Sequence, residues 1–349
     1  MDQLYREIQE QPDVFGRIRD QYINEDFFRY WNKEVFGKII LTGMGSSLFA
    51  AYPCYLRLLE RGFPVNWIDA SELLHYGLDG LREDDTLLFF SQSGESYELL
   101  KIVESLPKKR PRLIGVTAHP NSALGGSCDE IIDIMSGPER AITSTKTHSS
   151  MVAVANLWAM ALVGEKQRFL DSALAFDLLV QEADRVIQSA PEWARRTLRN
   201  LEFTRGTQTK AIIARGPALS SAWHGCLCFY ECAKEPFMSF TGGQFRHGPL
   251  ELAFKPMLAI VLALPGKTNG IMCALASELL EKKCGVLLIG QCDTKAGLAH
   301  EVLSLRFPDE YFGPLLSIIP LELLSYYLAE EKGIEPGTAY LISKTTSRE

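Results

Sequence analysis

The chain has 349 residues, of which 46% are hydrophobic, and a formal net charge of −7 at pH 7. This length favours about two domains, each large enough to bury its own core. The acidic balance argues against a nucleic-acid partner, because a phosphate backbone is held chiefly by clustered Lys and Arg. The apolar stretches fall short of the roughly 20 residues that span a bilayer, which argues against a membrane partner. The start, Met1 to Glu7, has neither a basic nor an apolar signal-peptide region, so we expect a cytoplasmic location.

The first half of the chain predicts a helical opening followed by alternating strands and helices. Residues 1–36 mix charged and apolar positions and predict an N-terminal helical segment. Short apolar runs then predict five strands: Lys38–Leu41, Val65–Ile68, Thr86–Phe90, Leu113–Val116 and Glu130–Ile134. Strands separated by helices imply a mainly parallel sheet covered on both faces. We expect residues 37–175 to form the first domain.

A long amphipathic stretch, Glu165 to Leu201, precedes a second cycle of the same kind. We assign residues 176–205 to connecting helices, residues 206–330 to a second domain and residues 331–349 to a C-terminal tail. An apolar helix over Pro314–Glu330 and three strands are predicted in the second domain: Lys210–Ala214, Leu258–Leu264 and Gly285–Gly290. Both halves open with an apolar strand that runs into a glycine turn. The predicted fold class is therefore α/β, with two tandem doubly wound parallel sheets and flanking helices.

The eight cysteines do not form a metal-ligand pattern. Cys226, Cys228 and Cys232 share one predicted helix with no second pair nearby, and the others are scattered: Cys54, Cys128, Cys273, Cys284 and Cys292. We therefore expect reduced, mostly buried thiols and no metal site.

The most informative segment is the strand Thr86–Phe90 and the turn that follows it. The turn reads Ser91-Gln92-Ser93-Gly94-Glu95-Ser96, and a helical pattern begins directly after it. Backbone N–H groups at a helix N-terminus are unpaired and can hold an anion. Side chains that can donate further hydrogen bonds make this turn a predicted phosphate-binding site: Ser91, Gln92, Ser93 and Ser96. Taken alone, a turn of this kind is more often a simple helix cap.

Two further hydroxyl-rich turns occur in the first half. Gly45, Ser46 and Ser47 follow the first predicted strand, and Ser144 and Thr145 precede a long apolar helical run. Three such turns favour a common ligand over three unrelated caps. The pattern of a strand, Ser-Gln-Ser-Gly-Glu-Ser and a helix resembles the sugar isomerase (SIS) domain family. The resemblance implies two tandem SIS domains and a phosphosugar ligand held by these turns.

Two segments of the second half resemble one particular group of proteins within the SIS domain family. Trp223–Glu231 predicts a helix with Glu231 near its end, and Phe245–Leu250 contains His247-Gly248-Pro249. Together with Ala214–Gly216 before them, these segments resemble the isomerase part of glucosamine-6-phosphate synthases. The resemblance implies that Glu231 moves a proton between C1 and C2 of the sugar and that His247 opens the ring.

Elementary chemistry supports both roles. A partly desolvated carboxylate can remove a proton from a carbon next to a carbonyl, and imidazole can transfer a proton near neutral pH. A helix-surface glutamate and a capping or core histidine are the alternative interpretations of Glu231 and His247.

Lys344 resembles the lysine near the C-terminus of the same synthases. The resemblance implies a role at the open-chain carbonyl, either as an imine or by electrostatic contact; an exposed tail lysine is the alternative. The sequence departs from the synthase pattern, because Cys228 and His224 stand where the family has a lysine and a glutamate, and Ala339-Tyr340 replaces a Pro-Arg pair. We expect no glutaminase domain, because the resemblance is to the isomerase part alone. Shortened relatives of this kind include deglycases that split phosphorylated Amadori compounds into glucose 6-phosphate and a free amine.

These observations predict an enzyme that acts on a phosphorylated ketosamine or ketose. It would be a fructosamine 6-phosphate deglycase or would perform ammonia-type glucosamine 6-phosphate chemistry. No metal or organic cofactor is expected, because the carbonyl itself stabilises the developing negative charge. By resemblance we expect at least a homodimer, with His247 supplied by the neighbouring chain.

Two other classes of function are weaker interpretations. A phosphosugar-binding sensor would keep the phosphate turns but would not need both Glu231 and His247. A dehydrogenase is disfavoured because Gly43 and Gly45 lack the third glycine of the dinucleotide fingerprint, although Asp69 lies about where a ribose-binding acid would fall.

Overall fold

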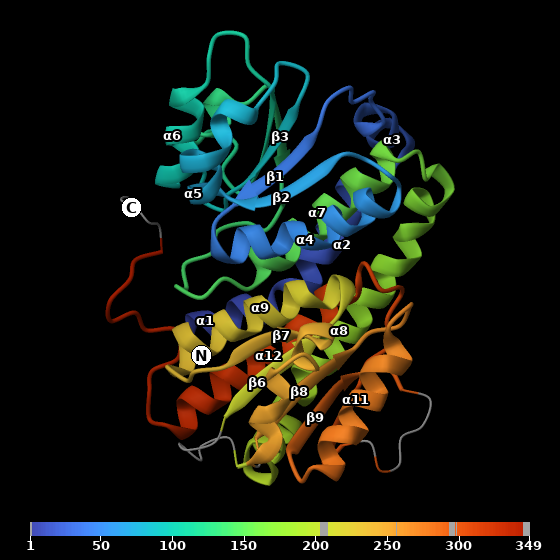
Figure 1. Cartoon of the computed structure of the whole chain (residues 1–349), viewed down its shortest axis with the longest axis vertical. Coiled ribbons are helices and arrows are strands. Elements are labelled where there is room, and N and C mark those ends of the chain that lie inside the picture. The colour runs from blue at the N-terminus through green and yellow to red at the C-terminus, as the bar shows by residue number, and fades with distance from the viewer. Residues whose placement is uncertain (1, 203–208, 256, 293–296, 298, 345–349) are drawn as a thin grey trace. The chain divides into compact units, whose positions relative to one another are not determined.

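The structure, a computed structural model, describes residues 2–202, 209–255, 257–292, 297 and 299–344. The chain divides into two compact units, each built on one five-stranded parallel sheet (Figure 1). The first unit holds residues 13–140, 146–176 and the tail from Leu341, and the second unit holds residues 1–12, 141–145 and 177–340. The units are thus interleaved in the sequence, so residues of one predicted turn, 141–145, belong to the second unit.

The sheet of the first unit contains the five strands expected from the sequence, with ends that differ by one or two residues. Its strands are β1 (Ile39–Gly43), β2 (Val65–Asp69), β3 (Thr86–Phe90), β4 (Arg112–Thr117) and β5 (Glu130–Asp133), in the order β2-β1-β3-β4-β5. Gly43 pairs with Phe90, and Phe90 pairs with Val116. The turns after β1, β3 and β4 therefore leave the same carboxyl edge of the sheet, where ligands bind in open α/β sheets.

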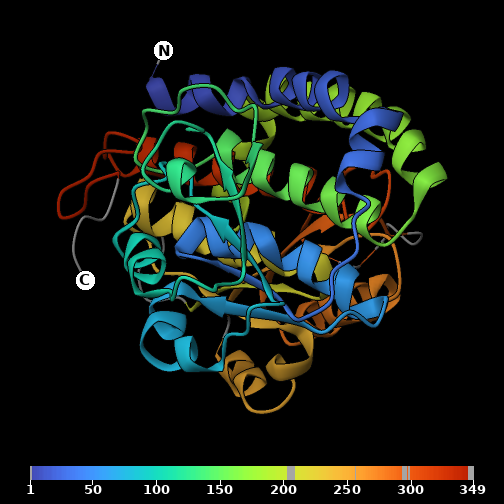
Figure 2. The same cartoon turned by 90° about the horizontal axis from the view of Figure 1, so that it is seen from above.

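Helices cover both faces of this sheet. On one face Leu99 and Ile102 of α6 (Tyr97–Ser105) pack against the strands, together with Leu73 from the π-helical turn that follows α5 (Ala70–Glu72). The helices α4 (Gly45–Glu60) and α7 (Lys146–Leu162) contact the strands as well, and Figure 2 shows helices of this unit on both sides of its strands. The remaining helices are α2 (Gln11–Tyr22) and α3 (Glu25–Trp31).

The sheet of the second unit repeats this topology. Its strands are β6 (Lys210–Ala214), β7 (Met238–Thr241), β8 (Leu258–Ala263), β9 (Gly285–Gly290) and β10 (Glu301–Ser304), in the order β10-β9-β8-β6-β7. Read from the other edge, this is the order of the first sheet, with β6 equivalent to β1 and β9 equivalent to β4. The predicted internal repeat is confirmed, whereas the sequence did not predict β7 and β10.

The second sheet also has helices on both faces. Met272, Leu275 and Leu279 of α11 (Asn269–Glu281) pack on one face, and α9 (Leu219–Cys228) and α12 (Gly313–Glu331) contact each other and strands of the sheet. The short helices α1 (Gln3–Gln9) and α10 (Gly242–Phe245) complete this unit. None of the helices within the described ranges is long and apolar enough to cross a membrane.

The connecting segment is one continuous helix. The structure shows α8 (Lys166–Asn200) where the sequence predicted several connecting helices, so this part of the prediction was too fragmented. Residues 203–208, at the predicted start of the second domain, lie outside the described residues, as does the tail beyond Lys344.

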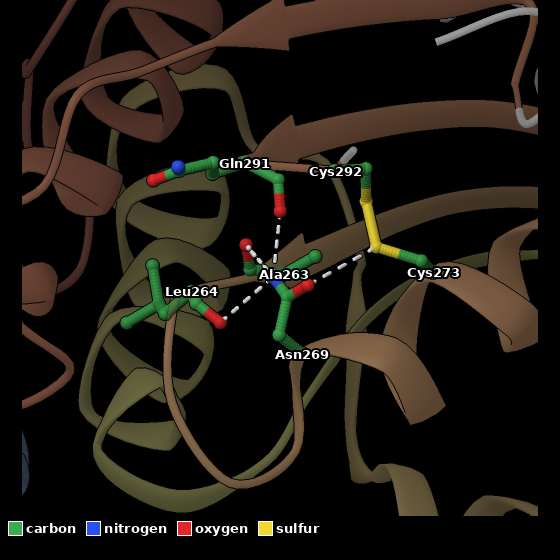
Figure 3. The surroundings of a disulfide bond; sticks show 6 residues. All are labelled: Ala263, Leu264, Asn269, Cys273, Gln291 and Cys292. Carbon is green, nitrogen blue, oxygen red and sulfur yellow. Dashed lines mark hydrogen bonds between the residues drawn. A yellow bond between two sulfur atoms is a disulfide. The ribbon is translucent and has the colours of Figure 1, made fainter. Parts of the chain in front are cut away.

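The prediction of reduced thiols throughout was wrong for two of the eight cysteines. Cys273 of α11 and Cys292, just after β9, form a disulfide with a Cα–Cα distance of 6.4 Å (Figure 3). The pair is 19 residues apart, and only the packing of α11 beside the end of β9 brings it together. The other six cysteines are free, and all but Cys128 are buried. Burial raises the pKa of Cys54, Cys226 and Cys232 to about 12, so these thiols stay protonated.

Loss of this disulfide is expected to destabilise the second unit. Replacing Cys273 with serine frees a loop of this length in the unfolded chain, which corresponds to up to about 3 kcal/mol in the free energy of unfolding. Thermal unfolding with and without reductant measures the effect: the wild type should unfold earlier with reductant, and C273S should not respond. Cys284→Ser, which removes a buried free thiol, is the matched control and should keep the response. Eight free thiols in the untreated wild type by mass spectrometry would contradict the disulfide.

Candidate functional site

The turn after β3 is braced by its own side chains. The Ser91 hydroxyl is buried, accepts a hydrogen bond from the Gly94 backbone N–H at 3.0 Å and lies 3.0 Å from the Ser96 hydroxyl. Gly94 has φ +66°, and a Cβ there would lie 1.9 Å from the Ser122 hydroxyl oxygen. Only glycine fits this position, so the sequence Ser-Gly is required by the geometry of the turn.

An open depression of about 520 Å³ lies beside this turn. It is lined by Ser93 and Glu95 from the turn and by residues 118–122, which follow β4. Gln92 extends its amide nitrogen to 3.4 Å from Nε2 of His119. Of the four residues predicted in this turn, Ser93 lines the open space, while Ser91 and Ser96 contact each other. The size suits a small ligand such as a sugar phosphate.

The turn after β1 has a similar construction. Gly43 lies so close to β3 that a Cβ there would be 2.6 Å from the Phe90 carbonyl oxygen, and α4 then begins at Gly45, whose φ is +50°. The Ser46 hydroxyl lies 3.3 Å from Nδ1 of the buried His148, the third residue of α7. Ser47 is only partly buried. The sequence did not predict His148 as a partner of this turn.

The loop 141–145 is joined to the helix that leads to Glu231. Nε2 of His224, on α9, lies 2.9 Å from the Ser144 carbonyl oxygen, which can only accept, so this nitrogen carries the proton. The Cys228 sulfur lies 3.6 Å from the same nitrogen. Thr145 is fully buried. The two residues that depart from the synthase pattern, His224 and Cys228, thus form one buried group that contacts the predicted sugar-binding loop.

Cys228 does not replace the positive charge of the family's lysine. Burial raises the pKa of its thiol well above the usual value, and the nearby carboxylates of Glu322 and Glu231 raise it further. The thiol is therefore neutral and uncharged beside Glu231.

Glu231 lies where α9 changes its geometry. The helix continues after Cys228 into a π-helical turn, Phe229–Ala233, and the Oε2 atom of Glu231 in this turn is buried. Such single π-turns in α-helices are frequent at functional sites. The sequence predicted Glu231 near a helix end, and the structure shows that the helix ends in this turn.

Lys234 connects this turn to the beginning of the C-terminal tail. It adopts a left-handed backbone conformation, with φ +51°, and its ammonium donates to the Glu231 carbonyl oxygen. The same ammonium donates to the Thr338 carbonyl oxygen at 2.6 Å and lies 5.1 Å from the centre of the Tyr340 ring. The sequence did not predict this contact.

His247 lies on the surface of the second unit. It follows α10, its side chain is exposed, and its backbone N–H donates to the Gln244 carbonyl oxygen at 2.9 Å. The next residue, Gly248, has φ +123°, a conformation that favours glycine in the His-Gly-Pro motif. The predicted alternative of a core histidine does not apply.

Lys344 is not an exposed tail lysine. Its ammonium lies 2.7 Å from Oε2 of Glu139, whose side chain is fully buried. Glu139 also accepts from the Thr147 backbone N–H at 3.2 Å and from the Thr147 hydroxyl at 2.7 Å, at the first turn of α7. The first unit thus brings Lys344 to the same helix start that contributes His148 to the turn after β1. Nothing in the sequence around Glu139 indicated this role.

Asp69, which lies about where a ribose-binding acid would fall in the sequence, caps a helix in the structure. Asp69 accepts a hydrogen bond from the Ser71 backbone N–H at 2.9 Å and caps α5, as expected for a helix cap. Within the described ranges, no group of three or more His, Cys, Asp or Glu side chains could hold a metal ion.

The chain matches known sugar-phosphate proteins. Residues 36–161 match the model of the SIS domain family. Glutamine–fructose-6-phosphate aminotransferase (isomerizing) from Pyrobaculum aerophilum is 27% identical over 324 residues, which are 89% of this chain and 51% of that protein. The same enzyme from Shouchella clausii is 27% identical over 365 residues, 99% of this chain and 58% of that protein. The chain thus spans little more than half the length of these curated relatives.

The same likeness is found among solved structures. The C-terminal domain of glucosamine-fructose-6-phosphate aminotransferase from Francisella tularensis has a TM-score of 0.83 at 20% identity, covering 96% of this chain and 98% of that one. At this identity the likeness establishes the fold, which is that of two parallel α/β sheets flanked by helices.

Proposed function

We propose that this chain, whose residues 36–161 match the SIS domain model and which is similar to part of the glutamine–fructose-6-phosphate aminotransferases, is a phosphosugar enzyme acting on a phosphorylated ketosamine or ketose. The reaction is a proton transfer between C1 and C2, either as a fructosamine 6-phosphate deglycase or in ammonia-type glucosamine 6-phosphate chemistry. A homodimer and a cytoplasmic location belong to the same proposal.

One observation carries the proposal. The helix whose last turn carries Glu231 is hydrogen-bonded through His224 to the loop of Ser144, and both lie in the second unit. The proposed base and a proposed sugar-binding loop are therefore held in a fixed relation by a buried contact. A sensor needs the loop, but it does not need a partly buried carboxylate near the end of the helix that is fixed to the loop.

In the deglycase direction the steps use these groups in turn. His247 transfers the proton that opens the sugar ring. Glu231 takes a proton from C1 of the ketosamine and returns it to C2, which converts the ketosamine into an aldimine. Water then adds to C1 and the amine leaves, so that ketosamine phosphate and water give aldose phosphate and free amine.

The phosphate and sugar hydroxyls are assigned to the hydroxyl-rich turns. We assign the phosphate to the turn after β3, where Ser93 lines the open depression and Gln92 extends toward His119. We place the Gly45–Ser47 turn and the Ser144 loop at the sugar. His247 is exposed, which fits a residue offered to the site of a neighbouring chain.

A coupled assay tests the function. Release of glucose 6-phosphate is measured from a panel of fructosamine 6-phosphates, beside glucosamine 6-phosphate formation from fructose 6-phosphate and ammonium. Release from the panel would establish a deglycase, and glucosamine 6-phosphate would establish the synthase-like direction. If neither assay gives a product while calorimetry shows that glucose 6-phosphate still binds, the proposed enzymatic function is overturned. That result would favour a phosphosugar-binding sensor.

A further inference from the structure

A second open pocket lies at the carboxyl edge of the second sheet. It encloses about 620 Å³, within the range of small-molecule sites. Its lining comes from α8, from the residues after β9 and from the end of β10, and includes Glu182, Arg185, Gln291, Ser304, Arg306 and Phe307. It shares no residue with the turns and side chains of the proposed reaction.

The position of this pocket follows from the repeated topology. Because β9 and β10 of the second sheet are equivalent to β4 and β5 of the first, the pocket opens at the type of edge where open α/β sheets bind ligands. In the first unit this edge carries the depression beside Ser93. The second unit therefore has its own pocket at the equivalent edge of its sheet.

A buried carboxylate organises two arginines at this pocket. Glu182 is fully buried and receives Nε and Nη2 of Arg185 at 3.0 and 2.6 Å, and the backbone N–H and Nε of Arg306 at 2.9 and 3.0 Å. Burial alone would raise the pKa of Glu182, but these hydrogen bonds outweigh it and lower the pKa. Glu182 thus stays ionised and holds both guanidinium groups in place.

The arginines have donors left for a ligand. Arg185 also donates Nη2 to the Ser304 carbonyl oxygen, and among the described residues Arg306 uses only Nε and its backbone N–H. Both terminal nitrogens of Arg306 and Nη1 of Arg185 have no hydrogen-bond partner within the described ranges. The two side chains are 64% and 46% exposed, so they reach the open pocket. One of the two arginines balances the negative charge of Glu182. The other gives the group of three side chains a net positive charge.

Hydrogen bonds and the disulfide hold in place the part of the pocket formed by Gln291 and Cys292. Asn269 donates its side-chain amide to the carbonyl oxygens of Ala263, Leu264 and Gln291, at 3.2, 3.0 and 2.6 Å. The disulfide of Cys292 fixes the next residue to α11 (Figure 3). The ends of β8 and β9 are therefore tied together, and the polar rim at Gln291 is preorganised.

We propose that this pocket binds a small organic phosphate. The spare guanidinium donors of Arg306 and Arg185 hold the phosphate oxygens, since planar guanidinium groups match phosphate in a two-point geometry. Gln291 supplies a further polar contact, and Phe307 lies against the body of the ligand. The volume exceeds that of inorganic phosphate alone, which favours an organic ligand.

Binding of glucose 6-phosphate by calorimetry tests the proposal, with glucose and inorganic phosphate as comparison probes. The wild type should show two sites for glucose 6-phosphate. R306Q should lose one of them, with affinity reduced roughly tenfold or more. Ser93→Ala should weaken binding at the other site, and the double variant should weaken binding at both sites. R306K keeps the positive charge but loses the two-point hydrogen bonding of the guanidinium group, so it should bind with intermediate affinity. Arg195→Gln, which changes another exposed arginine of the same unit that is paired with Glu330, is the control and should keep two sites.

The outcomes separate this pocket from the proposed function. R306Q and R306K that both bind as the wild type does would overturn the pocket, as would a single site that is lost in Ser93→Ala alone. If R306Q loses a site while Ser93→Ala changes nothing, the pocket stands and the phosphate assignment of the first unit fails. Circular dichroism of each variant shows that it is folded, and if R306Q is not, R306K decides the result. Equal binding of glucose would also overturn the role of the arginines.

Discussion

Replacing Glu231 with glutamine is expected to lower kcat by about 10²- to 10⁴-fold, the usual contribution of a positioned general base. Glutamine keeps the size and hydrogen-bonding capacity of the side chain but cannot take the proton from C1. Because the sugar phosphate is assigned to other residues, its affinity should stay within about threefold of the wild type. Steady-state kinetics on the best substrate of the panel, together with calorimetry of glucose 6-phosphate, measures both quantities.

A matched control separates loss of the base from loss of charge. Glu251 is an exposed carboxylate of the same unit, in the short helical turn after His247, and E251Q makes the same chemical change on the surface. Its kcat should match the wild type. Turnover of E231Q comparable to that of E251Q would remove Glu231 from the mechanism, whatever the substrate. A loss of affinity as large as the loss of kcat would assign Glu231 to binding instead.

The sequence predicted every strand that is buried along its whole length, and the two strands that it missed are not. The observed strands Ile39–Gly43, Thr86–Phe90 and Lys210–Ala214 are buried at every position, so the runs that predicted them are largely continuous apolar segments. In contrast, β7 and β10 lie at sheet edges and are only partly buried or exposed. Each is only four residues long and carries no long apolar run, so only the pairing with a neighbouring strand reveals them.

At the candidate site, motifs that are local in sequence were predicted, whereas contacts between distant segments were not. Motifs local in sequence, such as Ser91–Ser96 and His247-Gly248-Pro249, were recognisable because each is complete within a few consecutive residues. Contacts between distant segments were not: Glu139 and Lys344 are 205 residues apart, and His224 and Ser144 are 80 apart. Glu139 follows Gly137-Pro138 in a segment without helical or strand pattern. Its role depends on the tail returning to the first unit, which no spacing predicts.

Glu139 is expected to act on the reaction through Lys344. The carboxylate is fully buried, and its donors include the Thr147 N–H, the Thr147 hydroxyl and the Lys344 ammonium. E139Q removes the charge that holds the ammonium, so the tail lysine loses its fixed position. If Lys344 acts at the sugar carbonyl, E139Q and K344M should each lower kcat about 10- to 100-fold. The double variant should be no worse than either single one, because both remove the same positioned amine.

Lys344→Arg decides whether the amine itself takes part. Arginine keeps the positive charge and can pair with Glu139, but it does not form an imine. A thermal midpoint like that of the wild type with kcat as low as in K344M would show that the amine reacts. Recovery of kcat in K344R would show that Lys344 acts as a charge. If K344M and E139Q lower the thermal midpoint but leave kcat unchanged, the ion pair only anchors the tail, because a purely structural contact changes stability without changing the rate of a folded enzyme.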